Sequence, residues 1–182
     1  MGPPGTHPGP RRGGCILSSS DAAGRVVDRL AESGVGLAVY LPDSVLIGVT
    51  GQLEVDARIR TVVCTREDEG AAIASGAAVA GMLPVVLMEG SGVGYCGLIL
   101  SRAQLQRSGF LLIASHSPAL GERHDYHAAT RVVAAGVLDG LRIPYVVPRS
   151  LDELVETVGL AAQTVVGQRS VVGVLVPPHL LQ

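Results

Sequence analysis

Short apolar runs alternate along the chain with longer segments in which apolar residues recur at helical spacing. The runs are rich in Val, Ile and Leu, whereas Val26, Val27 and Leu30 fall on one face of a helix. This pattern predicts helices at 21–33, 44–53, 67–81, about 95–107, 126–140 and 150–166. It predicts strands at 37–40, 60–64, 84–88, 110–115, 144–147 and 171–176, the last being a strand or an extended tail.

The order of these elements indicates the fold class. Strands that are continuously apolar and separated by helices are typical of a parallel sheet covered on both faces. We therefore predict an α/β fold with a single doubly wound parallel sheet and helices on both faces. We expect this domain to span 21–182, after a disordered Gly/Pro-rich tail over 1–20.

Composition restricts the possible environments and partners of the chain. The chain is 47% hydrophobic and only 16% charged, and its mean hydropathy is +0.40, so we expect part of its surface to be buried against a partner. No apolar run approaches the roughly 18 residues of a membrane span, and the first residues do not form the apolar core of a secretory signal. Cys15, Cys64 and Cys96 lack metal-ligand spacing, which favours a reducing cytoplasm.

Charge argues against nucleic-acid binding and excludes one class of covalent catalysis. The net charge is −2, there is no basic cluster, and aromatic residues make up 3% of the chain, so nucleic-acid binding is not expected. All 14 basic residues are Arg, and the absence of Lys excludes a Schiff-base mechanism.

An acidic corner follows the predicted strand at 60–64. Glu67, Asp68 and Glu69 begin a helix made of very small residues. Carboxylates at a helix N-terminus are stabilised by the helix dipole, so one of them can serve as a cap. Ligands of open α/β sheets bind outside the carboxyl ends of the strands, however, so the corner is also a candidate site.

A glycine-rich segment and a group of histidines admit alternative interpretations. Gly92-Val-Gly94-Tyr-Cys-Gly97 matches a dinucleotide fingerprint, but no acid ends the following strand. We therefore favour a tight loop that needs close backbone approach or positive φ over NAD binding. His116, His124 and His127 lie near Glu122 and Asp125, but their spacing matches no standard metal motif, so we favour a solvated or substrate-facing loop and predict no metal ligands.

Three segments, in order, resemble one family of enzymes. Glu67 and Gly76, nine positions apart in a small-residue helix, are similar to the glutamate segment of the pyrimidine-binding (PYR) domain of thiamine-diphosphate enzymes. Tyr40-Leu-Pro42-Asp43-Ser44 and residues 84–94 resemble two further segments of phosphonopyruvate decarboxylases. The chain most resembles the separate alpha subunits of sulfopyruvate decarboxylases and their relatives, and the likeness covers about 24–166.

The resemblance implies the PYR-domain subunit of a thiamine-diphosphate-dependent 2-oxo acid decarboxylase, which is a carboxy-lyase. It implies that Glu67 hydrogen-bonds the cofactor's pyrimidine ring and so helps the cofactor lose its reactive proton. The spacing to Gly76 favours Glu67 over its rivals Asp68 and Glu69. The implied cofactor contacts are Glu67, Gly70, Ser91 and Gly92, and the implied substrate contacts are Pro42, Asp43, Ser44, Glu89 and His116.

The chain lacks the motif with which the family binds the diphosphate group of the cofactor. Thiamine-diphosphate enzymes hold the diphosphate and Mg²⁺ with a Gly-Asp-Gly motif and a later Asn, and Leu138-Asp139-Gly140 does not match this pattern. The resemblance therefore implies a separate diphosphate-binding (PP-domain, beta) subunit that holds Mg²⁺, in an α2β2 or larger assembly, with this chain inactive alone. A non-catalytic scaffolding subunit is the main alternative, ahead of an NAD-binding domain.

The chain departs from the family at three positions near the expected substrate. Glu89-Gly90 stands in place of Gln-Asn, Tyr95 in place of Asn, and His116 in place of an Arg. An Arg could bind a sulfonate or phosphonate through two parallel hydrogen bonds, which His116 cannot do. Because Glu89 would also repel such a group, these departures argue against a doubly anionic substrate.

Overall fold

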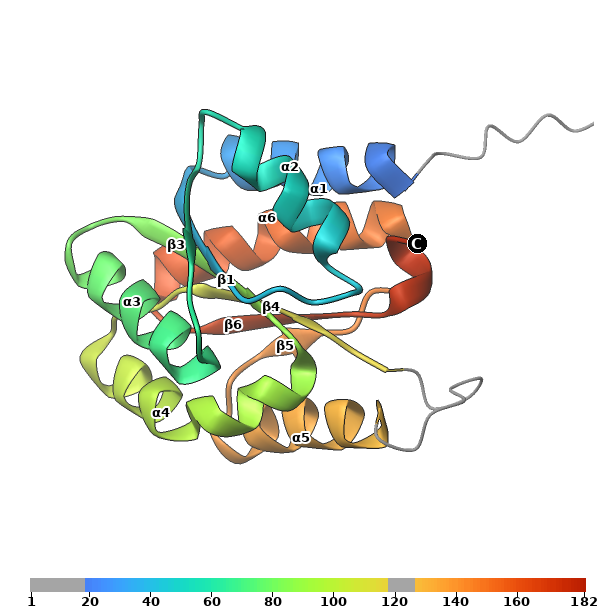
Figure 1. The fold of residues 1–182 in the computed structure, drawn as a ribbon. Helices are drawn as coiled ribbons and strands as arrows, with labels where there is room; N and C mark the ends of the chain where they lie inside the picture. Colours follow the sequence, from blue (N-terminus) through green and yellow to red (C-terminus); the bar gives the residue numbers. More distant parts are fainter. Residues whose placement is uncertain (1–18, 118–126) are drawn as a thin grey trace, which may run out of the picture.

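A parallel sheet is the centre of the computed structural model, which describes residues 19–117 and 127–182 (Figure 1). Its strand order is β2-β1-β3-β4-β6-β5, and every pairing is parallel. The strands are β1 (Val35–Tyr40), β2 (Arg60–Val63), β3 (Leu83–Met88), β4 (Leu111–Ser115), β5 (Tyr145–Val146) and β6 (Val172–Val176). The α-helices are α1 (Ser19–Glu32), α2 (Ile47–Val55), α3 (Glu67–Val79), α4 (Gly97–Gln106), α5 (His127–Gly140) and α6 (Leu151–Gln168), and the 3₁₀ helices are η1 (Gly90–Cys96) and η2 (Pro178–Leu180).

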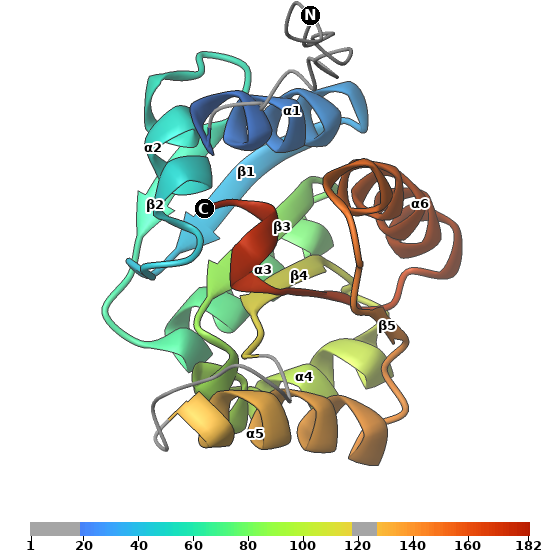
Figure 2. The same ribbon diagram turned by 90° about the vertical axis from the view of Figure 1, so that its right-hand side faces the viewer.

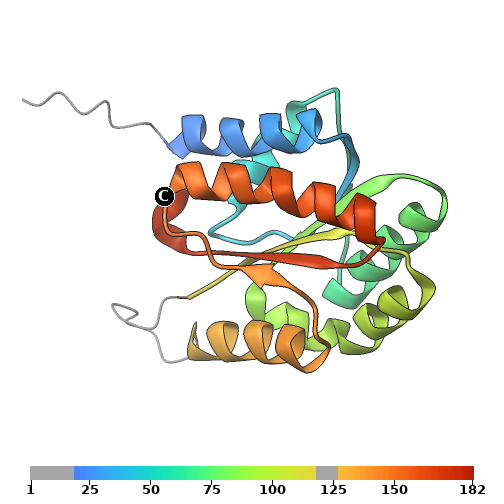
Figure 3. The same cartoon turned by 180° about the vertical axis from the view of Figure 1, so that it is seen from behind.

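Helices cover both faces of the sheet, as the sequence predicts. Helices α1, α2 and α6 lie on one face, and α3, α4 and α5 lie on the other (Figures 1, 2 and 3). Alternate residues of each strand enter the two cores: Val85 and Leu87 pack toward α1 and α6, whereas Val86 and Met88 pack toward α3 and α4. The predicted doubly wound α/β fold is therefore confirmed.

The strand order places a topological switch point at the carboxyl ends of β1 and β3. Strand β1 lies between β2 and β3, so the chain leaves β1 toward one side and later returns to its other side. The segments that follow β1 and β3 therefore diverge at the carboxyl ends of their strands. Such a switch point is where open α/β sheets bind ligands.

Two predicted elements differ from those in the structure. The helix expected at 44–53 begins at Ile47, because Asp43 Oδ1 accepts hydrogen bonds at 2.9 Å from the backbone N–H groups of Val45 and Leu46 and holds a turn there. The segment after β3 forms the 3₁₀ helix η1 rather than an irregular loop. The region at 171–176, left open between a strand and a tail, is strand β6 between β4 and β5.

The expected N-terminal tail falls mostly outside the described residues. Ser19 and Ser20 already belong to α1. Within the described ranges, no helix is both long enough and apolar enough to cross a bilayer.

Candidate active site

Glu67 stands at the first position of α3, after the short turn that follows the carboxyl end of β2, and its side chain lies against Gly92 of η1. A Cβ atom on Gly92 would fall 2.3 Å from Glu67 Cγ and 2.6 Å from its Oε1. The absence of a side chain at Gly92 is thus what allows Glu67 to occupy this position. Glu67 is half-buried, and its carboxylate has no hydrogen bond or ion pair with any described residue.

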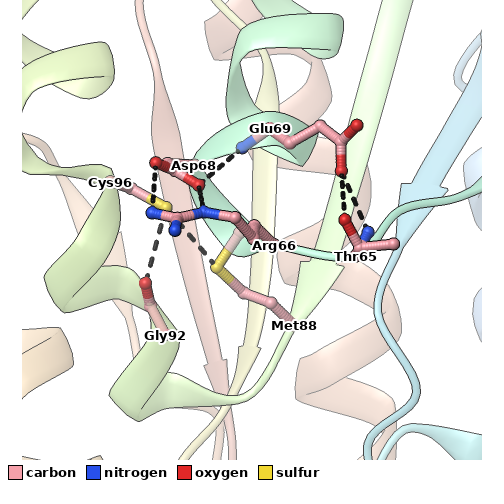
Figure 4. Close-up of polar contacts among 7 residues, drawn as sticks. All are labelled: Thr65, Arg66, Asp68, Glu69, Met88, Gly92 and Cys96. Carbon is pink, nitrogen blue, oxygen red and sulfur yellow. Dashed lines mark hydrogen bonds and ion pairs between the residues drawn. The ribbon is translucent and has the colours of Figure 1, made fainter.

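The two neighbouring acids are already engaged (Figure 4). Arg66 donates two hydrogen bonds to Asp68, at 2.9 and 3.0 Å, and these lower the pKa of the Asp68 carboxyl. Glu69 Oε2 accepts from the backbone N–H and the hydroxyl of Thr65, at 3.0 and 3.1 Å, and these bonds lower the Glu69 pKa. Asp68 and Glu69 therefore stabilise the beginning of α3, and Glu67 alone of the three acids is left without such a contact among the described residues.

Buried sulfur atoms surround Gly92 and the start of α3. The Cys96 thiol lies 3.5 Å from the backbone carbonyl oxygen of Gly92 and 3.9 Å from Met88 Sδ (Figure 4). Burial raises the Cys96 pKa to about 12 and the Cys64 pKa to about 11, and the negative charge of Glu67 contributes to both increases. Both thiols are therefore protonated at neutral pH.

The other residues implied in cofactor contact occupy different positions. Ser91 is half-buried in η1 beside Gly92. Gly70 faces the sheet rather than the switch point: a Cβ atom there would lie 3.0 Å from Cys64 Sγ and 3.6 Å from side-chain atoms of Val39 and Val86. Gly70 therefore brings the first turn of α3 close to the sheet.

The glycine-rich segment serves close packing. Its members Gly92 and Gly94 approach neighbouring elements, and a Cβ atom on Gly94 would fall 2.8 Å from Val133 Cγ1 of α5. None of the three glycines of the motif has a positive φ; Gly34 and Gly81 are the described glycines that do. Close backbone approach, rather than a left-handed turn, therefore explains Gly92 and Gly94, whereas a Cβ atom on Gly97 would meet nothing within 4 Å.

A cavity of about 430 Å³ opens at the carboxyl ends of β1, β3 and β4. All five residues implied in substrate contact line it, although they come from three separate segments of the sequence. The lining consists of Pro42, Asp43, Ser44, Val45, Glu89, Ser115, His116, Ser117, His127, Thr130, Pro178 and Gln182. Glu67 is not among these residues; it stands beyond β1, at the end of the edge strand β2.

Hydrogen bonds hold the segments around the cavity together. The Ser115 hydroxyl donates to Asp43 Oδ2 at 3.1 Å and accepts from the Gly90 backbone N–H at 3.4 Å. A Cβ atom on Gly90 would fall 2.3 Å from the Ser115 carbonyl oxygen, so only glycine fits there. The Thr130 hydroxyl of α5 donates to Glu89 Oε1 at 2.9 Å. The loops after β1, β3 and β4 are thus joined through Ser115.

His116 carries an unsatisfied atom beside this cavity. Its ring is half-buried, and its Nδ1 atom is buried without a hydrogen-bond partner among the described residues. Burial, and then the positive charge of Arg131, lower the His116 pKa, which favours the neutral imidazole at pH 7. Of the other residues in the histidine group, His127 also lines the cavity, whereas His124, Glu122 and Asp125 lie outside the described residues.

Sequence reasoning missed several residues of the cavity. Thr130, Pro178 and Gln182 carry no local signal, because only the packing of α5 and the segment after β6 brings them to this edge. Within residues 19–117 and 127–182, no group of three or more His, Cys, Asp or Glu side chains is arranged to hold a metal ion.

Comparison with known proteins places the chain in a family. No protein-family model matches it. It is 31% identical over 140 residues to the sulfopyruvate decarboxylase subunit alpha of Methanothermobacter thermautotrophicus, covering 76% of this chain and 85% of that protein. It is 27% identical over 156 residues to the subunit of the same name from Methanococcus maripaludis, covering 85% and 93%. The chain therefore belongs to the family of sulfopyruvate decarboxylase alpha subunits.

Proposed function

We propose that this chain is the PYR-domain subunit of a thiamine-diphosphate-dependent 2-oxo acid decarboxylase that acts together with a separate beta subunit. The observation that carries the proposal is the half-buried Glu67 carboxylate, which lies against Gly92 without a partner among the described residues. The names of the two relatives, both sulfopyruvate decarboxylase alpha subunits, support the same reaction class.

The residues around Glu67 fit the pyrimidine ring of the cofactor. A half-buried carboxylate without a partner among the described residues can accept a hydrogen bond from a ligand. Cys96 and Met88 are fully buried, so they support Gly92 from within the core, through the contact of the Cys96 thiol with its carbonyl oxygen, and do not touch a ligand. Glu67 would hold the ring by a hydrogen bond, with Ser91 and Gly92 beside it. Gly70 would act by keeping α3 close to the sheet. Thiamine diphosphate, when bound, supplies a nucleophilic carbon and an electron sink for the loss of CO₂.

Glu67 is preferred as the residue that binds the cofactor because Asp68 and Glu69 already have hydrogen-bond partners. Using either rival would require breaking the hydrogen bonds that begin α3, namely those from Arg66 to Asp68 and from Thr65 to Glu69. Glu67 requires no such rearrangement. A preorganised acceptor that is aimed before binding contributes most to catalysis, because it needs no reorganisation during the reaction.

The diphosphate and Mg²⁺ are assigned to the partner subunit. Asp139, the acid of the Leu138-Asp139-Gly140 sequence, lies at the end of α5 and contacts the Tyr145 hydroxyl, before β5 and away from the carboxyl edge of the sheet. Exposed apolar side chains on α3, η1 and α4 support a partner: they are Val79, Tyr95, Leu98 and Leu105. We propose an α2β2 or larger cytoplasmic assembly in which the site lies between subunits.

The substrate in this proposal is a small 2-oxo acid that occupies the cavity lined by Asp43, Glu89 and His116. Pro42 and Ser44 shape its entrance, since both belong to the loop after β1 that lines the cavity. The neutral imidazole of His116 offers one ring N–H as a donor and one nitrogen as an acceptor.

The test compares Glu67→Gln with the matched control Asp68→Asn in the complex with a co-expressed chain that carries Gly-Asp-Gly. We expect both variants to assemble, as judged by size-exclusion chromatography. With thiamine diphosphate and Mg²⁺, Glu67→Gln should lose CO₂ release by about 100-fold or more. Asp68→Asn should stay within about threefold, because it weakens the contacts of Asp68 with Arg66 and the Glu69 N–H but leaves the Glu67 carboxylate in place.

Three outcomes would contradict the proposal in different ways. Full activity of Glu67→Gln would remove Glu67 from the mechanism. Failure of the wild-type complex to bind thiamine diphosphate, measured by calorimetry, would favour a scaffolding subunit. Binding of NADH in place of thiamine diphosphate would favour the nucleotide-binding alternative.

A further inference from the structure

The cavity beside His116 holds two carboxylates that are fixed by neutral donors rather than by cations. Asp43 accepts hydrogen bonds from two backbone N–H groups and from the Ser115 hydroxyl. Glu89 accepts from the Thr130 hydroxyl. Neutral donors, unlike an Arg or Lys partner, do not cancel the charge of a carboxylate. Both residues therefore contribute negative charge to the lining.

No opposing Arg or Lys is found among the described residues of the lining. They include no Arg, and the chain contains no Lys. Arg131 of α5 exerts a positive field on His116, but it does not line the cavity. His116 itself is shifted toward its neutral form by burial and by this charge.

The remaining polar groups are suited to hydrogen bonding with an uncharged group. Ser44 and Ser117 line the same cavity, whereas the Ser115 hydroxyl is already engaged by Asp43 and Gly90. Glu89 Oε2 has no hydrogen bond with any described residue, so it is an acceptor that is open to a ligand. A sulfonate carries acceptors only, and both a sulfonate and a phosphonate are negatively charged at neutral pH, so either would meet this oxygen with repulsion between like charges.

We propose that the cavity selects a 2-oxo acid whose distal end carries a hydrogen-bond donor such as a hydroxyl group, and that Glu89 makes it reject a sulfonate or phosphonate there. This inference rests on the proposed function and narrows its substrate class. It separates the chain from the two relatives, whose names specify sulfopyruvate. Glu89 is the specificity-determining residue, because it is exposed at the cavity and its Oε2 atom is open.

The experiment compares three 2-oxo acids that differ at the distal end: 3-hydroxypyruvate, sulfopyruvate and 2-oxobutyrate. Each is assayed with the assembled complex, thiamine diphosphate and Mg²⁺. We expect kcat/KM for 3-hydroxypyruvate to exceed that for sulfopyruvate by about tenfold or more. Glu89→Gln, which keeps the shape and removes the charge, should reduce this ratio about tenfold, mainly by improving sulfopyruvate. Glu156→Gln, an exposed acid of α6 on the other face of the sheet, should leave the ratio unchanged.

A binding measurement keeps this inference separate from the proposed function. Calorimetry on the Glu67→Gln complex gives dissociation constants for 3-hydroxypyruvate and sulfopyruvate, with and without the added Glu89→Gln change. If no 2-oxo acid is turned over by the wild-type complex, the proposed function fails, and the two constants still decide the selectivity. Three results would overturn the inference: tighter binding of sulfopyruvate than of 3-hydroxypyruvate, a ratio of the two dissociation constants that Glu89→Gln leaves unchanged, or no binding of either acid.

Discussion

Glu67 and Gly92 lie so close together that a single methyl group on Gly92 would fall 2.3 Å from Glu67 Cγ. Glu67 begins α3, which follows β2, and Gly92 belongs to η1, which follows β3. Strands β2 and β3 lie on either side of β1. This contact fixes where the carboxylate can stand at the edge of the sheet. The position of Glu67 is therefore set by the packing of η1 against α3 and not by a hydrogen bond.

Gly92→Ala should displace the Glu67 side chain and reduce activity without unfolding the domain. A displacement of about 1 Å can cost about 100-fold in rate when a reacting group must be aligned. We expect a loss of that size in kcat of the assembled complex, measured by CO₂ release. The far-ultraviolet circular dichroism spectrum should stay unchanged.

The matched control for this change is Gly97→Ala. Gly97 lies in α4, just after η1, and a Cβ atom there would meet nothing within 4 Å. Its helical conformation accepts alanine, so kcat should remain within about twofold of wild type. Equal losses in both variants would show that Gly92 acts on the stability of η1 rather than on Glu67.

Asp43→Ala should destabilise the loop after β1. The change removes an acceptor for two backbone N–H groups and for Ser115, and it should lower the free energy of unfolding by about 1–3 kcal/mol. Urea unfolding measures this loss. Ser44→Ala, at the exposed neighbouring position, should change stability by less than about 0.5 kcal/mol. Similar values for both variants would contradict a structural role for Asp43.

The ionised Asp56 carboxylate should stabilise the fold at neutral pH but not in strong acid. Hydrogen bonds from the side chain and backbone N–H of Arg58 lower the Asp56 pKa from 3.8 to about 2. Because the folded-state pKa lies below the unfolded one, the contribution is complete above about pH 4 and disappears as pH falls toward 2. The Tm difference between wild type and Asp56→Asn should shrink over that range, and a constant difference would refute this linkage.

Cys64 and Cys96 should resist alkylation in the folded chain. Burial raises their pKa values from 9.0 to about 11 and about 12, so the reactive thiolate is scarce at pH 8. At a pH below the pKa, raising a thiol's pKa by about one reduces its thiolate fraction about tenfold. In a Cys15→Ser chain, mass spectrometry should detect little reaction with iodoacetamide until urea is added. Rapid labelling without urea would mean that the thiols are accessible.

Local patterns in the sequence predicted most of the elements but not all of their boundaries. The apolar periodicity of residues such as Val26 and Leu30 is a property of neighbouring positions, so helix α1 could be predicted directly. The start of α2 could not, because the turn at Asp43 replaces its first helical residues. The sequence also left the last region open between a strand and a tail, since only pairing with β4 and β5 makes β6 a strand.

The candidate site divides in the same way. Resemblance pointed to Glu67, Asp43, Glu89 and His116, because these residues lie within recognisable sequence segments. The cavity contacts of Thr130 and Gln182 could not be predicted, since they arise where α5 and the segment after β6 meet the loops of other strands. The same holds for the hydrogen bond between Thr130 and Glu89.

The sequence by itself determined the fold class and the acids that begin α3, because periodicity and helix-start chemistry depend on residues a few positions apart. Only the tertiary structure decided which acid is left without a partner among the described residues. The contact of Glu67 with Gly92 joins two elements that are distant in the chain, and the contacts of Asp68 and Glu69 depend on how the chain turns at Thr65 and Arg66. The spacing to Gly76 already favoured Glu67, but only packing between separate elements brings Gly92 against its side chain.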